Sequence, residues 1–405
     1  MAQEAPKPEP TNTSSKPSET YIPIEKSPFE VKKEKWESDI KKILEKHHLF
    51  YSQDDWNTQI HGDRYMRLHV VEFDQNETDN RLLLKERFFK APLPDPDQVK
   101  EAKHKEFFIR QIKVQDYLDE RTDFPVTEVL DTNTQEAQGP MYAVMNWYQK
   151  GEGVGFLYTI EDSKELTAEH AIEAVKAIRD LSHQEEKLTP EVRAVLVKKA
   201  AFSDYIGFRA NLVKILSRQV SGTEDDFSPE KHVFAALMAE KTKTPDLVQR
   251  IDQLLEQVSP VIERNQGKGE HVVHGDFAPN NIFLGDGLAS DKFIGLDFEW
   301  AGISQNEVLA AAYDFGNMRA RAWNNPVFQE AFDKEMIASY AREGREEEGR
   351  VIVALGTLRS SLNLASYFEH NPKNFETEAE IKLRVGTEKD LLKPFEMLKT
   401  PTSST

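Results

Sequence analysis

Hydrophobic and polar positions follow two different periods along this chain, short alternating segments first and longer helical stretches afterwards. Residues 1–26 are rich in Pro, Ser, Thr, Lys and Glu and offer little to bury, so we expect a disordered tail there. Pro28 suits the first turn of a helix, and Ile40, Ile43 and Leu44 then recur at helical spacing. The ordered chain is therefore predicted to begin with a helix.

The next part of the chain has the pattern of a small sheet with one helix. The segments RYMRLHVVEF and RLLLKERFFK flank the polar turn QNETDN, which predicts a β-hairpin over residues 64–90. A charged, helical segment follows at 97–120, and residues 122–130 and 139–148 have the pattern of two more strands. Glycines at 151, 153 and 155 mark an expected flexible passage.

After that passage the periodicity is mostly helical. Thr167 is a good N-cap for the next helix. Further helices are expected at 189–219, 229–241, 246–265 and, after a strand-rich pair around HVVHGDFAPNNIF, on to about residue 398. We therefore predict an α+β fold with two lobes. A small N-terminal lobe with an antiparallel sheet would cover 27–148, a larger helical lobe 149–398, and a second disordered tail 399–405.

Composition narrows the class of protein. The 405 residues suit two lobes, and the formal net charge of -18 argues against nucleic-acid binding, which needs surplus Lys and Arg. No apolar run is long enough to span a membrane, and the N-terminus lacks the apolar core of a secretory signal. Cysteine is absent, which excludes disulfides and thiolate chemistry and fits a reducing compartment. We expect a cytoplasmic protein without membrane or nucleic-acid partners.

The stretch HVVHGDFAPNNIF holds the strongest chemical signal. Asp276 and Asn281 are five positions apart between two strand-like segments, and the apolar strand KFIGL then leads to Asp297. Phosphoryl transfer from a nucleotide needs an acid that orients the attacking hydroxyl and oxygen ligands that hold Mg²⁺ on the phosphates. One or two carboxylates with an amide suffice for that ion.

HGDxxxxN followed by a strand that ends in Asp resembles the aminoglycoside phosphotransferase / choline kinase family. LDFEWAG resembles its choline and ethanolamine kinase members, and HGD its aminoglycoside members. The resemblance implies a protein-kinase-like fold, ATP and Mg²⁺ as cofactors, and Asp276 as the catalytic base. It implies Asn281 and Asp297 as Mg²⁺ ligands and His274 as structural support of the loop. Glu299 would bind a second Mg²⁺ or cap the next loop.

Two other motifs compete with these assignments. His61-Gly62-Asp63 is a second HGD, but Leu68 stands where the asparagine should be, so we interpret it as a coincidence. Asp314-Phe315-Gly316 matches a protein-kinase metal motif, yet its surroundings predict a helix. The resemblance implies instead that Asp314 braces the catalytic loop.

For the nucleotide, the resemblance favours Lys85 as the lysine that meets the phosphates, with Lys90 as the alternate. The acid that should pair with it is unclear: the register falls on Gln111, and we nominate Glu106, the nearest acid upstream. The stretch MYAVMNWY resembles the hinge between lobes. The adenine would then bind near the backbone of Asn146 and Tyr148, with Met145 behind it.

The acceptor is predicted only as a hydroxyl of a small molecule, such as an aminoglycoside, an amino alcohol or a sugar. Trp300, Tyr313 and Trp323 are aromatic and Glu299, Glu307 and Asp314 acidic, which suits a cationic acceptor but equally suits core and helix surface. Two alternatives remain. A nucleotide-binding pseudokinase would explain the unassigned acid and the missing glycine-rich loop, whereas a protein kinase fits poorly because that loop is absent.

Overall fold

The protein was analysed as a computed structural model. It describes residues 28–51, 66–73, 81–87, 95–122, 124–138, 140–146, 153–155, 166–183, 188–217, 233–285, 293–295, 297–322, 324–370 and 389–398. Both predicted disordered tails lie outside these residues.

The N-terminal part is built on one antiparallel sheet. Its strands, in the order β1-β2-β3-β5-β4, are β1 Leu49–Tyr51, β2 Met66–Phe73, β3 Arg81–Arg87, β5 Tyr142–Asn146 and β4 Val129–Asn133. The predicted hairpin is confirmed, because Met66 pairs with Arg87 and Glu72 with Arg81. This sheet supplies the strand that carries Lys85.

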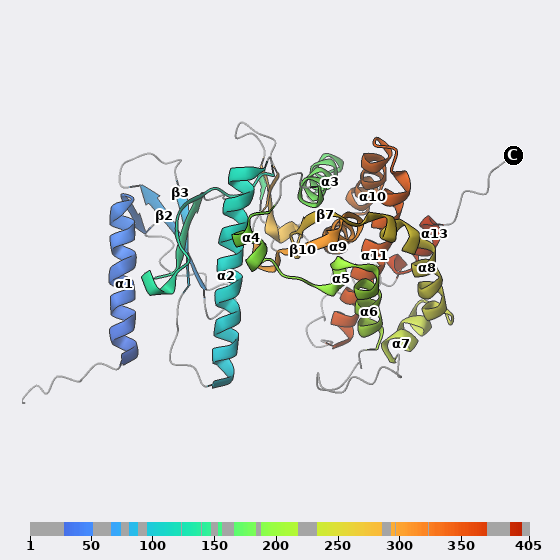
Figure 1. Ribbon diagram of the computed structural model, residues 1–405, viewed down its shortest axis with the longest axis horizontal. Helices are drawn as coiled ribbons and strands as arrows, with labels where there is room; N and C mark the ends of the chain where they lie inside the picture. The colour runs from blue at the N-terminus through green and yellow to red at the C-terminus, as the bar shows by residue number, and fades with distance from the viewer. Residues whose placement is uncertain are drawn as a thin grey trace, which may run out of the picture.

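Two helices cover opposite faces of this sheet, α1 (Pro28–Lys46) and α2 (Asp95–Arg121), as Figure 1 shows at the left. The side chains of β5 alternate between them. Tyr142 and Val144 pack with the cluster that includes α1, whereas Ala143 and Met145 pack with the cluster that includes α2. Both helices were predicted, and each begins within two residues of its expected start.

The strand predicted at 122–130 is largely wrong, because the regular strand is β4, Val129–Asn133. Pro125 has no N–H to give to a ladder. Its carbonyl instead accepts a hydrogen bond of 2.9 Å from the backbone N–H of Gly295, and Val126 forms an isolated parallel bridge with Gly295. The chain between α2 and β4 thus links the N-terminal part to a later strand.

The C-terminal part is mostly helical (Figure 1). It contributes most residues of the main hydrophobic core. Its helices are α3 Ala168–Ser182, α4 Pro190–Val195, α5 Ala200–Ser203, α6 Tyr205–Leu216, α7 Val233–Lys241, α8 Leu247–Asn265, α9 Glu307–Arg321, α10 Pro326–Ala341, α11 Glu346–His370 and α13 Lys393–Met397. Its strands form two small sheets, β7 Gln266–Val273 with β10 Gly302–Asn306, and β6 Gly153–Gly155 with β8 Ile282–Gly285 and β9 Phe293–Gly295.

Two expectations about this part need correction. The glycines predicted to form a flexible passage include Gly153 and Gly155, which pair with β8 as strand β6. The single helix predicted at 189–219 is three helices, because the chain leaves the helical path at Val197 to pair with β10. The backbone of Val197 exchanges hydrogen bonds with Ala301 and Ile303, at 3.1 and 3.0 Å.

The predicted fold class is confirmed: a small part with an antiparallel sheet precedes a larger helical part. The residue bounds of the two lobes stay a prediction. Among the described helices, none combines the length and apolarity that crossing a membrane requires.

Candidate active site

The HGD segment forms the turn between β7 and β8. His274 and Gly275 follow directly after β7, and the 3₁₀ helix η3 (Pro279–Asn281) leads into β8. Gly275 has φ +85°, and a Cβ there would lie 2.1 Å from the backbone oxygen of Trp300. Only glycine tolerates both conditions, so the middle residue of the motif is fixed by geometry.

The register between β8 and β9 brings Asn281 and Asp297 to one end of the sheet that these strands form. Ile282 of β8 pairs with Gly295 of β9. Asn281 directly precedes the first and Asp297 follows two residues after the second, so both emerge at the same end. Asp297 has φ 58°, a left-handed backbone that is uncommon for a residue other than glycine and often occurs at functional sites.

Asp276 is half-buried and held from two sides. The Asn281 side-chain amide donates to its backbone oxygen at 2.8 Å and to its Oδ2 at 2.9 Å. The Arg321 guanidinium donates to its Oδ1 at 3.3 Å. The structure therefore brings Asp276 and Asn281 together, as predicted from their spacing, and adds an arginine that the sequence did not indicate.

Asp314 lies behind the same turn, in helix α9 as the sequence pattern predicted. Its carboxylate accepts the backbone N–H groups of His274 and Gly275 at 2.7 and 2.9 Å. Burial raises the pKa of Asp314 to about 7, although the two N–H donors oppose the shift. Gly316, the glycine of the DFG match, packs against the backbone of Gly356 in α11. The motif is thus part of a helix contact.

His274 is completely buried between aromatic rings. Its ring lies 4.4 Å from the ring of Phe298 and 5.6 Å from that of Phe277, measured between centroids. These contacts fill the space beneath the turn and agree with a structural position for this histidine.

Lys85 joins the sheet to the turn region. Because Leu82 and Leu84 face α1, strand alternation turns Lys85 towards α2. There its ammonium group contacts the Gln111 side-chain oxygen, and it lies 3.5 Å from Asp297 Oδ1 and 3.4 Å from Glu299 Oε1.

These charges perturb one another. Burial would lower the pKa of Lys85, but the carboxylates of Asp297 and Glu299 outweigh it, so the pKa of Lys85 is raised. Burial raises the pKa of Glu299 to about 7; Lys85 opposes that shift and Asp297 adds to it. Two neighbouring carboxylates, of which Glu299 is largely buried, suit a divalent cation, which would relieve their repulsion.

The donor set therefore fits Mg²⁺ bound together with nucleotide phosphates. Asp297 and Glu299 supply carboxylate oxygens, and Asn281 stands at the same strand end. Within the described residues, no three His, Asp or Glu side chains already form a metal cage. Mg²⁺ in phosphoryl-transfer sites commonly keeps waters and phosphate oxygens as its other ligands.

Glu106 does not pair with Lys85. It is exposed on α2, near Arg110, whereas Gln111 makes the contact that the sequence register indicated. Gln111 is only 3% exposed, so it faces inward on this helix. The nomination of Glu106 was wrong because Glu106 lies on the exposed face of α2. The residue on the buried face that reaches Lys85 is Gln111, which carries an amide instead of an acid.

The predicted hinge is only partly described. Met145 is buried on the α2 side of β5, and the side-chain amide of Gln115 lies 3.9 Å from its sulfur. Asn146 ends β5, where it pairs with Leu82. Tyr148, the alternate Lys90 and the second HGD at 61–63 lie outside the described residues.

Four cations near the turn carry no sequence motif, and sequence reasoning missed them. Arg110 on α2 donates to the backbone oxygens of Glu299 and Val195, which ties α2 to the C-terminal part. The other three cations lie around the turn: Arg321 in α9, Lys199 at the start of α5, and Arg359 in α11. Their positions follow from helix packing, which local spacing does not encode.

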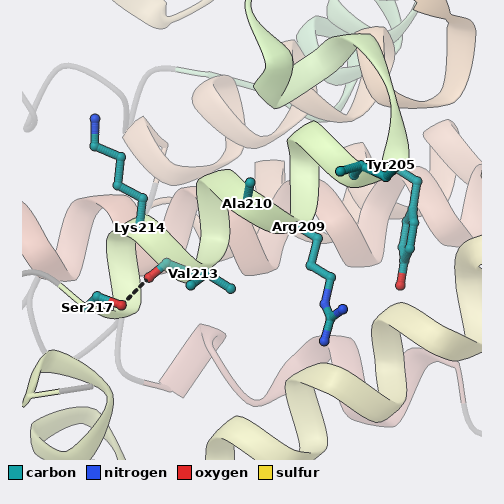
Figure 2. Close-up of a pocket in the computed structure, with 7 residues that line it drawn as sticks. Tyr205, Arg209, Ala210, Val213, Lys214 and Ser217 are labelled. Atoms are coloured by element: carbon teal, nitrogen blue, oxygen red, sulfur yellow. Dashed lines mark hydrogen bonds between the residues drawn. The ribbon is translucent and has the colours of Figure 1, made fainter. Parts of the chain in front are cut away.

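A groove of about 630 Å³ lies elsewhere, along α6 (Figure 2). Its lining residues are Tyr205, Ile206, Arg209, Ala210, Val213, Lys214 and Ser217. Ser217 in Figure 2 is turned back to donate to the backbone oxygen of Val213 at 2.8 Å. None of the predicted site residues lines this groove, so it has no part in the site described above.

No protein-family model matches the chain, and no curated protein matches its sequence. Solved structures do resemble it. A provisionally assigned aminoglycoside phosphotransferase from Ralstonia eutropha has 12% identity and a TM-score of 0.48 over 89% of this chain and 97% of its own. A microcompartment-associated aminopropanol kinase has 12% identity and a TM-score of 0.46 over 87% and 95%.

An ethanolamine kinase from Plasmodium vivax has 14% identity and a TM-score of 0.45 over 89% of this chain and 86% of its own. The likeness is remote, so the activity is argued from the site itself.

Proposed function

We propose that the protein is an ATP- and Mg²⁺-dependent phosphotransferase that phosphorylates a hydroxyl group of a small molecule. The observation that carries the proposal is the turn at 274–281. Its backbone is held by buried Asp314, and it presents Asp276 with Asn281 at the strand end that also delivers Asp297.

Each residue then has a task. Asp276 accepts the proton of the acceptor hydroxyl or orients that hydroxyl for in-line attack. Asn281 holds the Asp276 carboxylate in place. Lys85, buried beside two carboxylates, would bind nucleotide phosphates as a fixed cation. Bound Mg²⁺, held by Asn281, Asp297 and Glu299, would neutralise charge on the phosphates.

The remaining assignments follow the same proposal. The end of β5, near Met145 and Asn146, would bind the nucleotide base together with Tyr148. His274 and Asp314 would keep the turn in shape. The choice between ATP and GTP, like the expected cytoplasmic location, stays a prediction.

The test is product detection. The protein is incubated with Mg·ATP and a pool of amino alcohols, sugars, nucleosides, hydroxy acids and aminoglycosides, and phosphorylated products are identified by mass spectrometry. We expect at least one acceptor to gain a phosphoryl group in step with ADP formation. No product from any class, together with no ATP consumption, would remove the proposal.

A second candidate is a nucleotide-binding protein with weak catalysis. It is favoured by one contact, since the buried partner of Lys85 on α2 is the neutral Gln111 instead of an acid. This candidate predicts that Mg·ATP raises the melting temperature while no acceptor is phosphorylated.

A further inference from the structure

The side of the catalytic turn that faces α9 and α11 is positively charged. We define a basic cluster of Lys199, Arg321 and Arg359. The Arg321 guanidinium lies 3.3 Å from Oδ1 of Asp276. In the proposed function, the carboxylate of Asp276 is the group that contacts the acceptor hydroxyl. Arg359 donates to the side chain of Asn317 at 3.3 Å, and Asn317 donates to the backbone oxygen of Gly275 at 3.3 Å. Arg321 therefore contacts the turn directly, and Arg359 is linked to it through Asn317.

Lys199 stands at the start of α5, where the chain has just paired with β10. Its ammonium group lies 4.9 Å from the ring centre of Trp300 and 5.9 Å from that of Tyr313. Trp300 touches the turn, since its backbone oxygen blocks any side chain at Gly275. Lys199 is thus held beside the same turn by two aromatic faces.

The charges of Arg359 and Lys199 are poorly compensated. Arg359 is only 6% exposed, and its Nε has no hydrogen-bond partner within the described part of the chain. Among those residues, neither Arg359 nor Lys199 forms an ion pair with a carboxylate. The charge of Asp314 acts on both cations, but both of its oxygens already accept backbone N–H groups. A buried guanidinium without an anion is costly, which favours binding of one.

The groups expected to bind a cationic acceptor are meanwhile committed elsewhere. Glu307 is bound by Arg345 at 2.8 Å and by the Tyr340 hydroxyl at 2.9 Å, and Glu299 pairs with Lys85. The Tyr313 ring is covered by the Arg359 guanidinium, 3.5 Å from its centre. Trp323 lies outside the described residues. A cationic acceptor would therefore approach aromatic rings, those of Trp300 and Tyr313, that already contact Lys199 and Arg359.

We propose that the acceptor carries a negatively charged group, a carboxylate or a phosphate monoester, close to its reacting hydroxyl. This inference rests on the proposed function. The anionic group would take Arg321 from Asp276 and would lie between Arg321 and Lys199, which leaves the Asp276 carboxylate available to the hydroxyl proton. The hydroxyl oxygen then bonds to the γ-phosphorus of ATP, the bond to ADP breaks, and ADP leaves as the phosphate monoester forms.

The state of Lys199 supports this assignment. Burial lowers the pKa of Lys199 to about 8, and the positive charges of Arg359 and Arg110 add to the effect. A lysine that is crowded by other cations is stabilised in its charged form by a bound anion. The same crowding disfavours a second ammonium group from an acceptor.

The test compares hydroxyl compounds that differ in charge. Two anionic probes, 3-hydroxypropionate and glycerol 3-phosphate, are set against their neutral counterparts 3-hydroxypropionamide and glycerol, and against ethanolamine and choline. Phosphorylated products are quantified by mass spectrometry. We expect kcat/KM for one anionic probe to exceed that of its neutral counterpart by on the order of 10²-fold, as for a well-placed ion pair. Whether 3-hydroxypropionate or glycerol 3-phosphate reacts then shows whether the anionic group of the acceptor is a carboxylate or a phosphate.

Variants locate the effect. We expect Lys199→Gln and Arg321→Gln each to raise KM for the anionic probe by on the order of tenfold or more, while Lys199→Arg restores it. The shift of melting temperature with Mg·ATP should not change in these variants. Lys334→Gln, at a lysine 74% exposed on α10, is the matched control and should behave like the parent protein.

The outcomes separate the two proposals. Phosphorylation of ethanolamine, choline or glycerol in preference to the anionic probes would overturn the anionic acceptor while leaving the kinase proposal standing. If nothing is phosphorylated, calorimetric titration of the anionic probes into the protein with Mg·ATP decides. Binding that Lys199→Gln abolishes would support the anion site without the kinase reaction. Absence of binding would overturn the anionic acceptor, whereas the kinase proposal is decided by the product screen.

Discussion

The hydrogen bonds from the turn at 274–281 to Asp314 allow a quantitative prediction for Asp314→Asn. The carboxylate accepts two backbone N–H groups, at 2.7 and 2.9 Å, and is almost completely buried. An asparagine has one oxygen to accept with, and its amide must turn a donor towards the second N–H. One backbone N–H of His274 or Gly275 then stays unpaired in the interior, which costs about 1–3 kcal/mol.

We expect the free energy of unfolding of Asp314→Asn to fall by that amount in urea titrations near pH 6, where the burial-raised pKa keeps Asp314 largely protonated. Because the turn carries Asp276, we also expect kcat to fall by on the order of 10-fold to 10²-fold. Hydrogen exchange of at least one of the His274 and Gly275 amides should accelerate, since one of them loses its acceptor.

Asp204→Asn is the matched control for this substitution. Asp204 also accepts a backbone N–H with its carboxylate, from Gly207 at 2.7 Å, but it is the N-cap of α6, where Asn is about as good as Asp. Its free energy of unfolding should change by less than ~0.5 kcal/mol. If the amides of His274 and Gly275 keep their protection in Asp314→Asn, the bracing role assigned to Asp314 is refuted.

Two further predictions concern the turn and its basic side. Gly275→Ala combines a left-handed backbone with a Cβ 2.1 Å from the Trp300 oxygen, so it should lower the free energy of unfolding by about 2–5 kcal/mol. Gly267→Ala, with φ +72° and open space around it, should lose only about 1–2 kcal/mol. KM for an anionic acceptor should rise as pH increases through about 8, because Lys199 then loses its charge.

Both predictions have a contradicting result. Equal losses in Gly275→Ala and Gly267→Ala would mean that Trp300 does not press on the turn. For the pH profile, Lys199 faces Arg359 and Arg110, which lower its pKa, and Asp314 and Asp276, which raise it. In Lys199→Arg the side chain stays charged at pH 9, so the rise in KM should disappear. A rise in KM that persists in this variant would mean that another group titrates.

The sequence predicted the parts of the site that depend on local order along the chain. The Asp276–Asn281 spacing, the strand that ends before Asp297 and the helix around Asp314 all follow from periods and turns within a few residues. The strand at 122–130 failed because Pro125 and Val126 bind Gly295, far along the chain, and a local pattern does not contain that contact.

The basic cluster could not be predicted from the sequence for the same reason. Lys199, Arg321 and Arg359 lie at the N-cap of α5, in α9 and in α11, and no regular spacing in the sequence connects them. The acids in the same stretch suggested a cation, but their partners, Arg345 for Glu307 and Lys85 for Glu299, are distant in sequence. Only packing reveals which charges are already neutralised.

The central claim is that Asp276 orients the acceptor hydroxyl in a site that it shares with the nucleotide phosphates. It is tested most directly by the turnover of Asp276→Asn with the acceptor that the product screen identifies. The account predicts that kcat falls by on the order of 10² or more while Mg·ATP still raises the melting temperature as in the parent protein. Undiminished turnover in that variant would contradict it.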